Sequence, residues 1–205
     1  MDNTNHQEYL LEKLQGKTVV LLSQTGSRLY GLANQHSDWD WYAVTLEDTK
    51  AHQKVVGDED VTIMPFNRFL GLVAKGAPQA LEVLWNPEAY RDPRYAPMLS
   101  ALRPNLWESR YRHLVEQGGG DFPEERYSEE EVAYRKQKHN RHRVRLALQW
   151  LQMAQNGYYT PQLDDESLEK VLRAGDSEEH SLEFRDGVER PVSYTHLRAH
   201  ETRGN

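Results

Sequence analysis

Apolar and polar residues along the first half of the chain predict short strands that alternate with helices. Runs rich in β-branched and aromatic residues predict strands at residues 18–22, 39–44, 54–56 and 61–64. An apolar period near 3.6 residues predicts helices at residues 7–15, 66–75 and 78–85. Gly16 and Gly76 stand where two of these helices would end. The pattern predicts a mixed-sheet domain with flanking helices over residues 1–94.

From residue 95 onward the pattern predicts helices alone. The expected helices cover residues 95–102, 106–115, 128–155 and 165–172. Ser128 and Glu131 have capping-box spacing at the start of the longest one. The predicted fold class is therefore α/β (α+β), with a mixed sheet, flanking helices and a C-terminal helical domain over residues 95–175. Residues 176–191 are expected to form an incomplete element.

The residues after Pro191 do not follow the pattern of a folded domain. The stretch from Val192 to Thr202 resembles one translated frame of a transposase-type sequencing adapter. We interpret residues 192–205 as a non-native tail and leave them out of the fold and the site, the alternative being a natural polar tail. His196 and His200, which have the spacing of a helical metal pair, are discarded for this reason.

Composition narrows the class of protein. The 205 residues include no cysteine, which excludes a disulfide framework, a thiolate nucleophile and a cysteine-ligated metal. The longest apolar run, Val19 to Leu22, is too short to span a bilayer, and the N-terminus lacks the features of a signal peptide. We expect a cytoplasmic protein without a membrane partner. With 25 basic and 32 acidic residues the formal charge is −7, which disfavours a protein that coats nucleic acid.

A short polar motif follows the first predicted strand and carries the chemistry. Asp38 and Asp40 stand two apart in the next predicted strand, so their side chains would share a face. Such a pair of carboxylates repels itself unless a cation lies between them, and Mg²⁺ prefers oxygen ligands of this kind. Gly26 would let a phosphate approach the backbone, and Ser27 would help to hold it. The motif predicts nucleotidyl or phosphoryl transfer with metal ions, the alternative being a solvated acidic turn.

Gly-Ser-x-x-x-Gly followed by Ser-Asp-x-Asp, at residues 26–40, resembles the DNA polymerase beta-type nucleotidyltransferase superfamily. The longer string Gly-Ser-Arg-Leu-Tyr-Gly-Leu-Ala is most similar to the predicted nucleotidyltransferases associated with RNA repair. The resemblance covers about residues 18–160. It implies two Mg²⁺ ions, with Mn²⁺ as an alternative, and a third carboxylate on a later strand. Asp60 is the first candidate, with Asp58 and Glu59 as rivals, because a shift of one residue reverses the face of a strand.

Basic side chains follow one face of the long predicted helix. Lys138, His142 and Arg145 fall within about 60° of one another around a helix with 100° per residue. They match recurrent positions of the family that the chain resembles, which implies binding of a triphosphate across a cleft from the acidic motif. The alternative is a solvated basic face. Arg28 is a further candidate for phosphate contact, and equally for a surface residue.

These observations predict a Mg²⁺-dependent nucleotidyltransferase that moves a nucleoside monophosphate from a nucleoside triphosphate to a hydroxyl and releases pyrophosphate. The acceptor of the nucleoside monophosphate can be a nucleic acid end, a protein or a small molecule, and the sequence does not distinguish these three. The alternative from another class is a nucleotide-binding regulatory module without turnover. A productive third carboxylate would separate these two classes.

Overall fold

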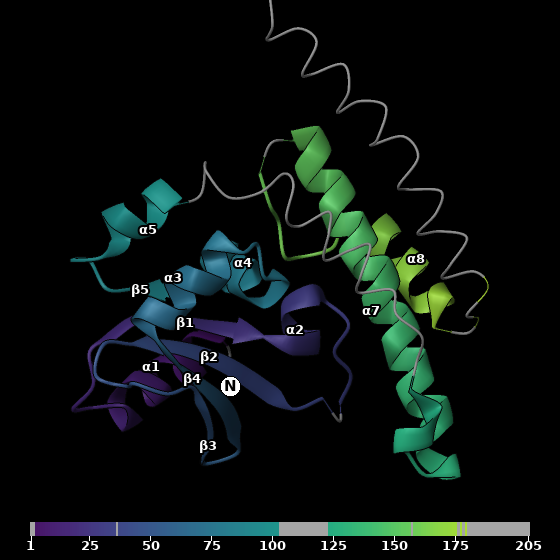
Figure 1. The fold of residues 1–205 in the computed structure, drawn as a ribbon, viewed down its shortest axis with the longest axis horizontal. Coiled ribbons are helices and arrows are strands. Elements are labelled where there is room, and N and C mark those ends of the chain that lie inside the picture. Colours follow the sequence, from purple (N-terminus) through teal and green to yellow (C-terminus); the bar gives the residue numbers. More distant parts are fainter. Residues whose placement is uncertain are drawn as a thin grey trace, which may run out of the picture. The chain divides into compact units, whose positions relative to one another are not determined.

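The computed structural model describes residues 3–35, 37–102, 123–156 and 158–175, together with Ser177 and Glu179. They form two compact units (Figure 1). One unit contains the described residues up to 102 together with Thr160–Gln162, and the other contains the remaining described residues. The helix expected at residues 106–115 and the tail at residues 192–205 lie outside the described residues.

The first unit is built on a five-stranded sheet with the order β3-β4-β2-β1-β5. The strands are β1 (Val19–Thr25), β2 (Trp39–Thr45), β3 (His52–Val56), β4 (Glu59–Pro65) and β5 (Tyr90–Arg91). Strands β2 and β4 pair in parallel, whereas the other neighbours are antiparallel. The predicted mixed sheet is confirmed.

Helices cover both faces of this sheet (Figure 1). Helix α1 (Asn3–Lys13) places Leu10 against one face, where Trp41 is buried. Helices α3 (Phe66–Ala74), α4 (Pro78–Trp85) and α5 (Ala96–Leu102) contribute to the core on the other face, where Tyr42 is buried. Trp41 and Tyr42 enter different cores because successive side chains of a strand point to opposite faces.

Prolines set the starts of two helices at the positions that the sequence predicts. Pro65 precedes the first residue of α3, and Pro78 occupies the first turn of α4, where its missing N–H has no cost. Gly76 ends the turn between them with φ of 68°, a backbone conformation that glycine adopts without strain. Both helices therefore pack against the sheet over a short connection.

The second unit contains α7 (Glu129–Asn156), α8 (Asp165–Ala174) and a 3₁₀ turn over Glu124–Arg126. The long helix expected at residues 128–155 is confirmed. Ser128 donates to the Glu131 carboxylate through both its N–H and its hydroxyl, at 3.3 and 3.0 Å, which stabilises the start of α7. Helices α7 and α8 pack together, and Val144 and Val171 are fully buried.

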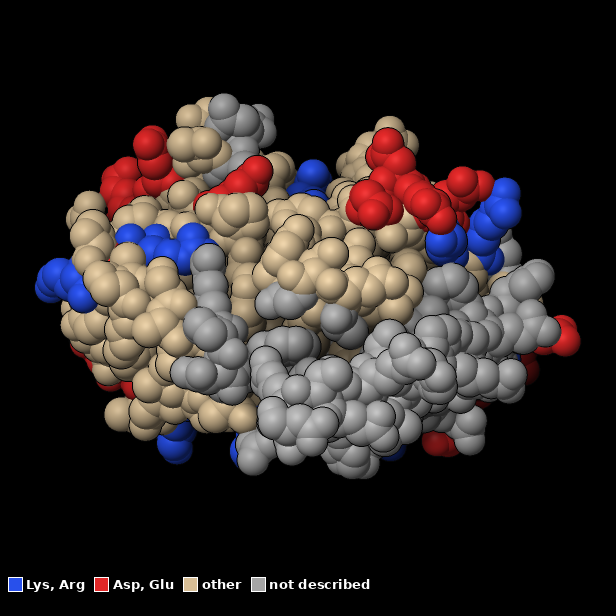
Figure 2. Space-filling model, turned by 90° about the horizontal axis from the view of Figure 1, so that it is seen from above, with Lys and Arg blue, Asp and Glu red and all other residues tan. Residues whose placement is uncertain are grey.

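No helix among the described residues is long and apolar enough to cross a membrane. On the face shown in Figure 2, acidic and basic side chains of the described residues lie in separate small groups, without one broad basic area. This distribution agrees with the negative net charge of the sequence, formally −7.

Candidate active site

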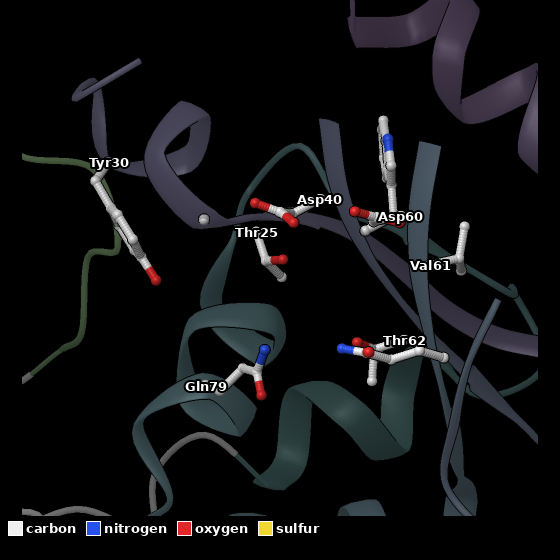
Figure 3. Close-up of a pocket in the computed structure, with 10 residues that line it drawn as sticks. Thr25, Tyr30, Asp40, Asp60, Val61, Thr62 and Gln79 are labelled. Carbon is white, nitrogen blue, oxygen red and sulfur yellow. The ribbon is translucent and has the colours of Figure 1, made fainter. Parts of the chain in front are cut away.

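A polar pocket of about 280 Å³ opens where β1 ends and the short helix α2 (Gly26–Tyr30) begins (Figure 3). All the residues that line it belong to the first unit. They are Thr25, Gly26, Tyr30, Asp40, Trp41, Gln53, Asp60, Val61, Thr62 and Gln79. The pocket is thus made from residues of four strands, of α2 and of the first turn of α4.

Asp40 and Asp60 form the acidic wall of this pocket. They are register partners in the parallel pairing of β2 with β4, so both carboxylates leave the sheet on the same face. Figure 3 shows both carboxylates directed into the pocket. Asp60 is exposed and Asp40 is half-buried, so the carboxylates remain within reach of a soluble ligand.

The two rivals of Asp60 lie elsewhere. Glu59 points to the opposite face, where it is 4% exposed, accepts a hydrogen bond of 2.8 Å from Trp41 Nε1 and contacts His6. Asp58 lies in the turn between β3 and β4. Of the three acidic residues, Asp60 alone stands beside Asp40, while its part in catalysis stays a prediction.

Asp38 lies directly before the strand that carries Asp40, so the expectation that both side chains share a strand face stays a prediction. Strand β2 begins at Trp39, so Asp38 belongs to the segment before it, is exposed and does not line the pocket. Because the pleat begins only at Trp39, strand alternation does not fix the direction of the Asp38 side chain. A role of Asp38 as a metal ligand stays a prediction.

Gly26 lies in close contact with Asp40. A Cβ atom at residue 26 would stand 2.3 Å from Asp40 Oδ2, and the residue has φ of 70°. Both facts favour glycine, because a side chain would collide with the carboxylate and L-residues rarely adopt this φ. The sequence points to glycine for the approach of a phosphate, whereas the structure requires it for the placement of Asp40.

Arg28 holds the segment that carries Asp38. Its Nη2 donates to the Ser37 carbonyl at 2.6 Å, and its Nε donates to the Asp38 carbonyl at 3.1 Å. The guanidinium also stands 4.1 Å from the centre of the Trp39 ring, in cation–π geometry. Neither Arg28 nor Ser27 lines the pocket, although both lie on α2 directly after Gly26.

The family that the sequence resembles implies Mg²⁺, and the carboxylates of the pocket fit this ion. Asp40 and Asp60 supply two hard oxygen ligands side by side, and Mg²⁺ commonly takes one or two carboxylates and completes its shell with water and phosphate. Within the described part of the chain, no three acidic or histidine side chains are grouped closely enough to hold a metal together.

Several pocket residues escape sequence reasoning. Tyr30 stands between two motif glycines and donates a hydrogen bond of 2.5 Å to Glu82, a buried acid of α4. A single acid within the apolar string Leu81-Glu82-Val83-Leu84 is a signal that could have drawn attention to this pair. Gln53, Thr62 and Gln79 carry no comparable signal, because the β3–β4 register brings the first two to the pocket and the packing of α4 brings Gln79.

Two of the three residues of the basic stripe, His142 and Arg145, are joined by a hydrogen bond on α7. Arg145 is 3% exposed and donates to Gln149 Oε1 at 2.9 Å and to His142 Nδ1 at 2.8 Å. Since a guanidinium can only donate, Nδ1 of His142 accepts in this arrangement. Lys138 and His142 are exposed. His142 and Arg145 are in contact on α7, while the grouping of Lys138 with them and the position of this face relative to the acidic pocket stay predictions.

Comparison with known proteins gives one clear family match. Residues 4–182 match the sequence model of RlaP, described as the RNA repair pathway DNA polymerase beta family. A crystal structure of a nucleotidyltransferase-like protein from Exiguobacterium sibiricum is similar over 93% of this chain and 73% of that one, with 10% identity and a TM-score of 0.35. No curated protein matches the sequence.

Proposed function

The chain belongs to the RNA repair pathway DNA polymerase beta family, and from this membership we propose that it transfers a nucleoside monophosphate to a hydroxyl acceptor. The donor in this proposal is a nucleoside triphosphate, the by-product is pyrophosphate, and the reaction depends on Mg²⁺. Membership places the protein among nucleotidyltransferases of the DNA polymerase beta type, with a nucleotide as substrate.

The Asp40–Asp60 pair carries the proposal. Two carboxylates on neighbouring parallel strands, on one face and in one pocket, are costly without a cation, since like charges in adjacent positions repel. A divalent ion removes this cost and at the same time attracts the phosphates of a nucleotide.

In this proposal Asp40 and Asp60 hold Mg²⁺, or Mn²⁺ as the alternative, through their carboxylate oxygens. The ion would supply charge neutralisation at the phosphates and activation of the attacking hydroxyl. Gly26 keeps space open beside Asp40 so that this carboxylate keeps its position. Arg28 steadies the segment of Asp38, the candidate for a further ligand, through the two carbonyl bonds.

The pocket cannot neutralise a triphosphate by itself. None of its ten lining residues is lysine or arginine, while two are carboxylates. Binding of a triphosphate therefore needs metal ions together with basic groups outside this lining. Lys138, His142 and Arg145 on α7 are the candidates that the sequence supplies for this role.

The family description favours an RNA end as the acceptor over a protein or a small molecule. The experiment is incubation with each α-labelled nucleoside triphosphate and Mg²⁺, with RNA carrying a free terminal hydroxyl. Label in RNA that disappears in the Asp40→Asn variant supports the proposal. Label in the protein itself or in a small molecule instead would identify another acceptor.

A regulatory module that binds nucleotides without turnover is the second candidate. The placement of Asp38 outside β2 favours it, because only two carboxylates line the pocket. Nucleotide binding without label in any acceptor, at saturating Mg²⁺ and Mn²⁺, would support this candidate over the transferase.

A further inference from the structure

Tyr30 and Glu82 form a polar pair at the edge of the acidic pocket. Tyr30 Oη donates to Glu82 Oε2 at 2.5 Å. Glu82 belongs to α4 and is 2% exposed, whereas Tyr30 belongs to α2, is half-buried and lines the pocket. A buried carboxylate that accepts a hydrogen bond from a hydroxyl fixes both the position of that hydroxyl and the direction of its hydrogen bond.

The pair presents its hydroxyl to the pocket from the side of α2. In Figure 3 the Tyr30 hydroxyl points toward the pocket interior, and Asp40 lies between Tyr30 and Asp60 in this view.

The direction of the hydrogen bond determines what this hydroxyl can recognise. Because the single hydroxyl proton of Tyr30 is donated to Glu82, any further group that hydrogen-bonds to the Tyr30 oxygen has to donate to it. Ionised phosphate oxygens only accept, so they are a poor match for this oxygen. A sugar hydroxyl donates and carries no charge, in keeping with the neutral neighbours Thr25 and Gln79 in the pocket.

We propose that Tyr30, oriented by Glu82, is a specificity-determining residue that accepts a hydrogen bond from a ribose hydroxyl of the nucleoside triphosphate. The inference rests on the proposed function, because it requires the triphosphate to bind at the Asp40–Asp60 pocket. It goes beyond that function by naming a residue pair that distinguishes ribonucleotides from nucleotides without sugar hydroxyls.

The test compares the dissociation constants of a ribonucleoside triphosphate and its 2′,3′-dideoxy counterpart, both as non-hydrolysable α,β-methylene analogues with Mg²⁺. The wild-type protein is expected to prefer the ribonucleotide by about three- to tenfold, the range of one net hydrogen bond. Tyr30→Phe is expected to remove this preference. Glu82→Gln is expected to keep it, because the amide oxygen still accepts from the Tyr30 hydroxyl. The 2′-deoxy and 3′-deoxy analogues then show which hydroxyl is read.

Tyr30→Phe takes a hydrogen bond from a buried carboxylate and can weaken folding. The double variant Tyr30→Phe, Glu82→Gln removes the buried charge together with the hydroxyl, so it can be tested if Tyr30→Phe does not fold. It too is expected to bind both analogues equally. An unchanged preference in these variants, or an equal affinity of the wild-type protein for both analogues, overturns the inference alone. Failure of the wild-type protein to bind any triphosphate overturns the proposed function as well.

Discussion

Asp40 and Asp60 occupy directly paired positions on two parallel strands, and their carboxylates point into the same pocket. Strand β4 reaches this position through the antiparallel β3–β4 hairpin, whose turn contains Gly57 and Asp58. The register of β4 against β2 decides which acidic residue stands beside Asp40. Repulsion between the two carboxylates is the feature that a bound cation would relieve.

Asp60→Asn is expected to weaken the binding of Mg²⁺ to the pocket. Removal of one of two adjacent like charges should raise the free energy of unfolding of the metal-free protein by about 0.2–1 kcal/mol. The increase in Tm on addition of Mg²⁺ with a non-hydrolysable triphosphate should be largely lost. Asp58→Asn, in the neighbouring turn and away from the pocket lining, is the matched control and should behave as the wild-type protein. If the Tm of both variants increased equally on this addition, Asp60 would not be a metal ligand.

Gly26→Ala is expected to weaken both folding and the site, because the new Cβ would stand 2.3 Å from Asp40 Oδ2 and the residue has φ of 70°. The positive φ alone should cost about 1–2 kcal/mol of the free energy of unfolding. Affinity for Mg²⁺ should fall further, since Asp40 must move. Urea denaturation and metal titration of the folded protein measure the two effects.

Gly71→Ala provides the control for this variant. Gly71 lies in α3, and a Cβ there would meet no atom within 4 Å. This change should be neutral or should raise the free energy of unfolding by up to about 1 kcal/mol, the helix preference of alanine over glycine. If Gly26→Ala lowered the free energy of unfolding no more than Gly71→Ala does, the close contact of residue 26 with Asp40 would not contribute to stability.

Arg28→Lys is expected to raise the Mg²⁺ concentration needed for half-maximal activity, because lysine cannot reproduce the two carbonyl bonds to Ser37 and Asp38. Triphosphate affinity at saturating Mg²⁺ should change little, since Arg28 does not line the pocket. Arg173→Lys, an exposed change on α8, is the control. The reverse pattern, weaker triphosphate binding with an unaltered Mg²⁺ requirement, would indicate a direct phosphate contact of Arg28.

Arg145→Ala is expected to raise the triphosphate dissociation constant about tenfold or more, as for loss of a hydrogen bond to a charged group. Lys138→Ala should have a smaller effect that depends more strongly on salt, because Lys138 is exposed. Arg135→Ala is the control on the same helix, since Arg135 is exposed and pairs with Glu131 at 3.3 Å. Calorimetric titration at two salt concentrations makes the comparison.

If Arg145→Ala binds the triphosphate as tightly as Arg135→Ala, the basic face of α7 has no part in the site. Because Arg145 is buried and bonded to Gln149, its loss also affects packing, so affinities must refer to the folded fraction. Arg145→Lys separates the two effects, since it keeps the charge but loses the fork of donors.

The strands and helices around the motif follow from the sequence because their signals are local. Pro65 and Pro78 mark helix starts, and β-branched runs mark β1 and β4. The two-residue strand β5 escapes prediction because it forms only through pairing with Leu21 and Leu22 of β1. Its existence depends on tertiary structure that no local pattern contains.

The site was predictable in part. Asp40 and Gly26 follow from the motif, but the choice among Asp58, Glu59 and Asp60 needs the register of β4, in which one residue reverses the face. Strand β2 begins at Trp39, as the sequence predicts, so strand alternation does not extend to Asp38. Glu82 reaches the pocket's edge from a distant segment, through a side-chain contact with Tyr30 that sequence spacing does not reveal.

The central claim is that the Asp40–Asp60 pocket catalyses Mg²⁺-dependent nucleotidyl transfer. The most direct measurement is the rate of pyrophosphate release from a nucleoside triphosphate with RNA ends present, for the wild-type protein and for Asp40→Asn, Asp60→Asn and Asp58→Asn. We expect pyrophosphate release that requires Mg²⁺ or Mn²⁺. This release should persist in Asp58→Asn and should be lost in Asp40→Asn and Asp60→Asn. Release at the wild-type rate in both Asp40→Asn and Asp60→Asn would contradict it.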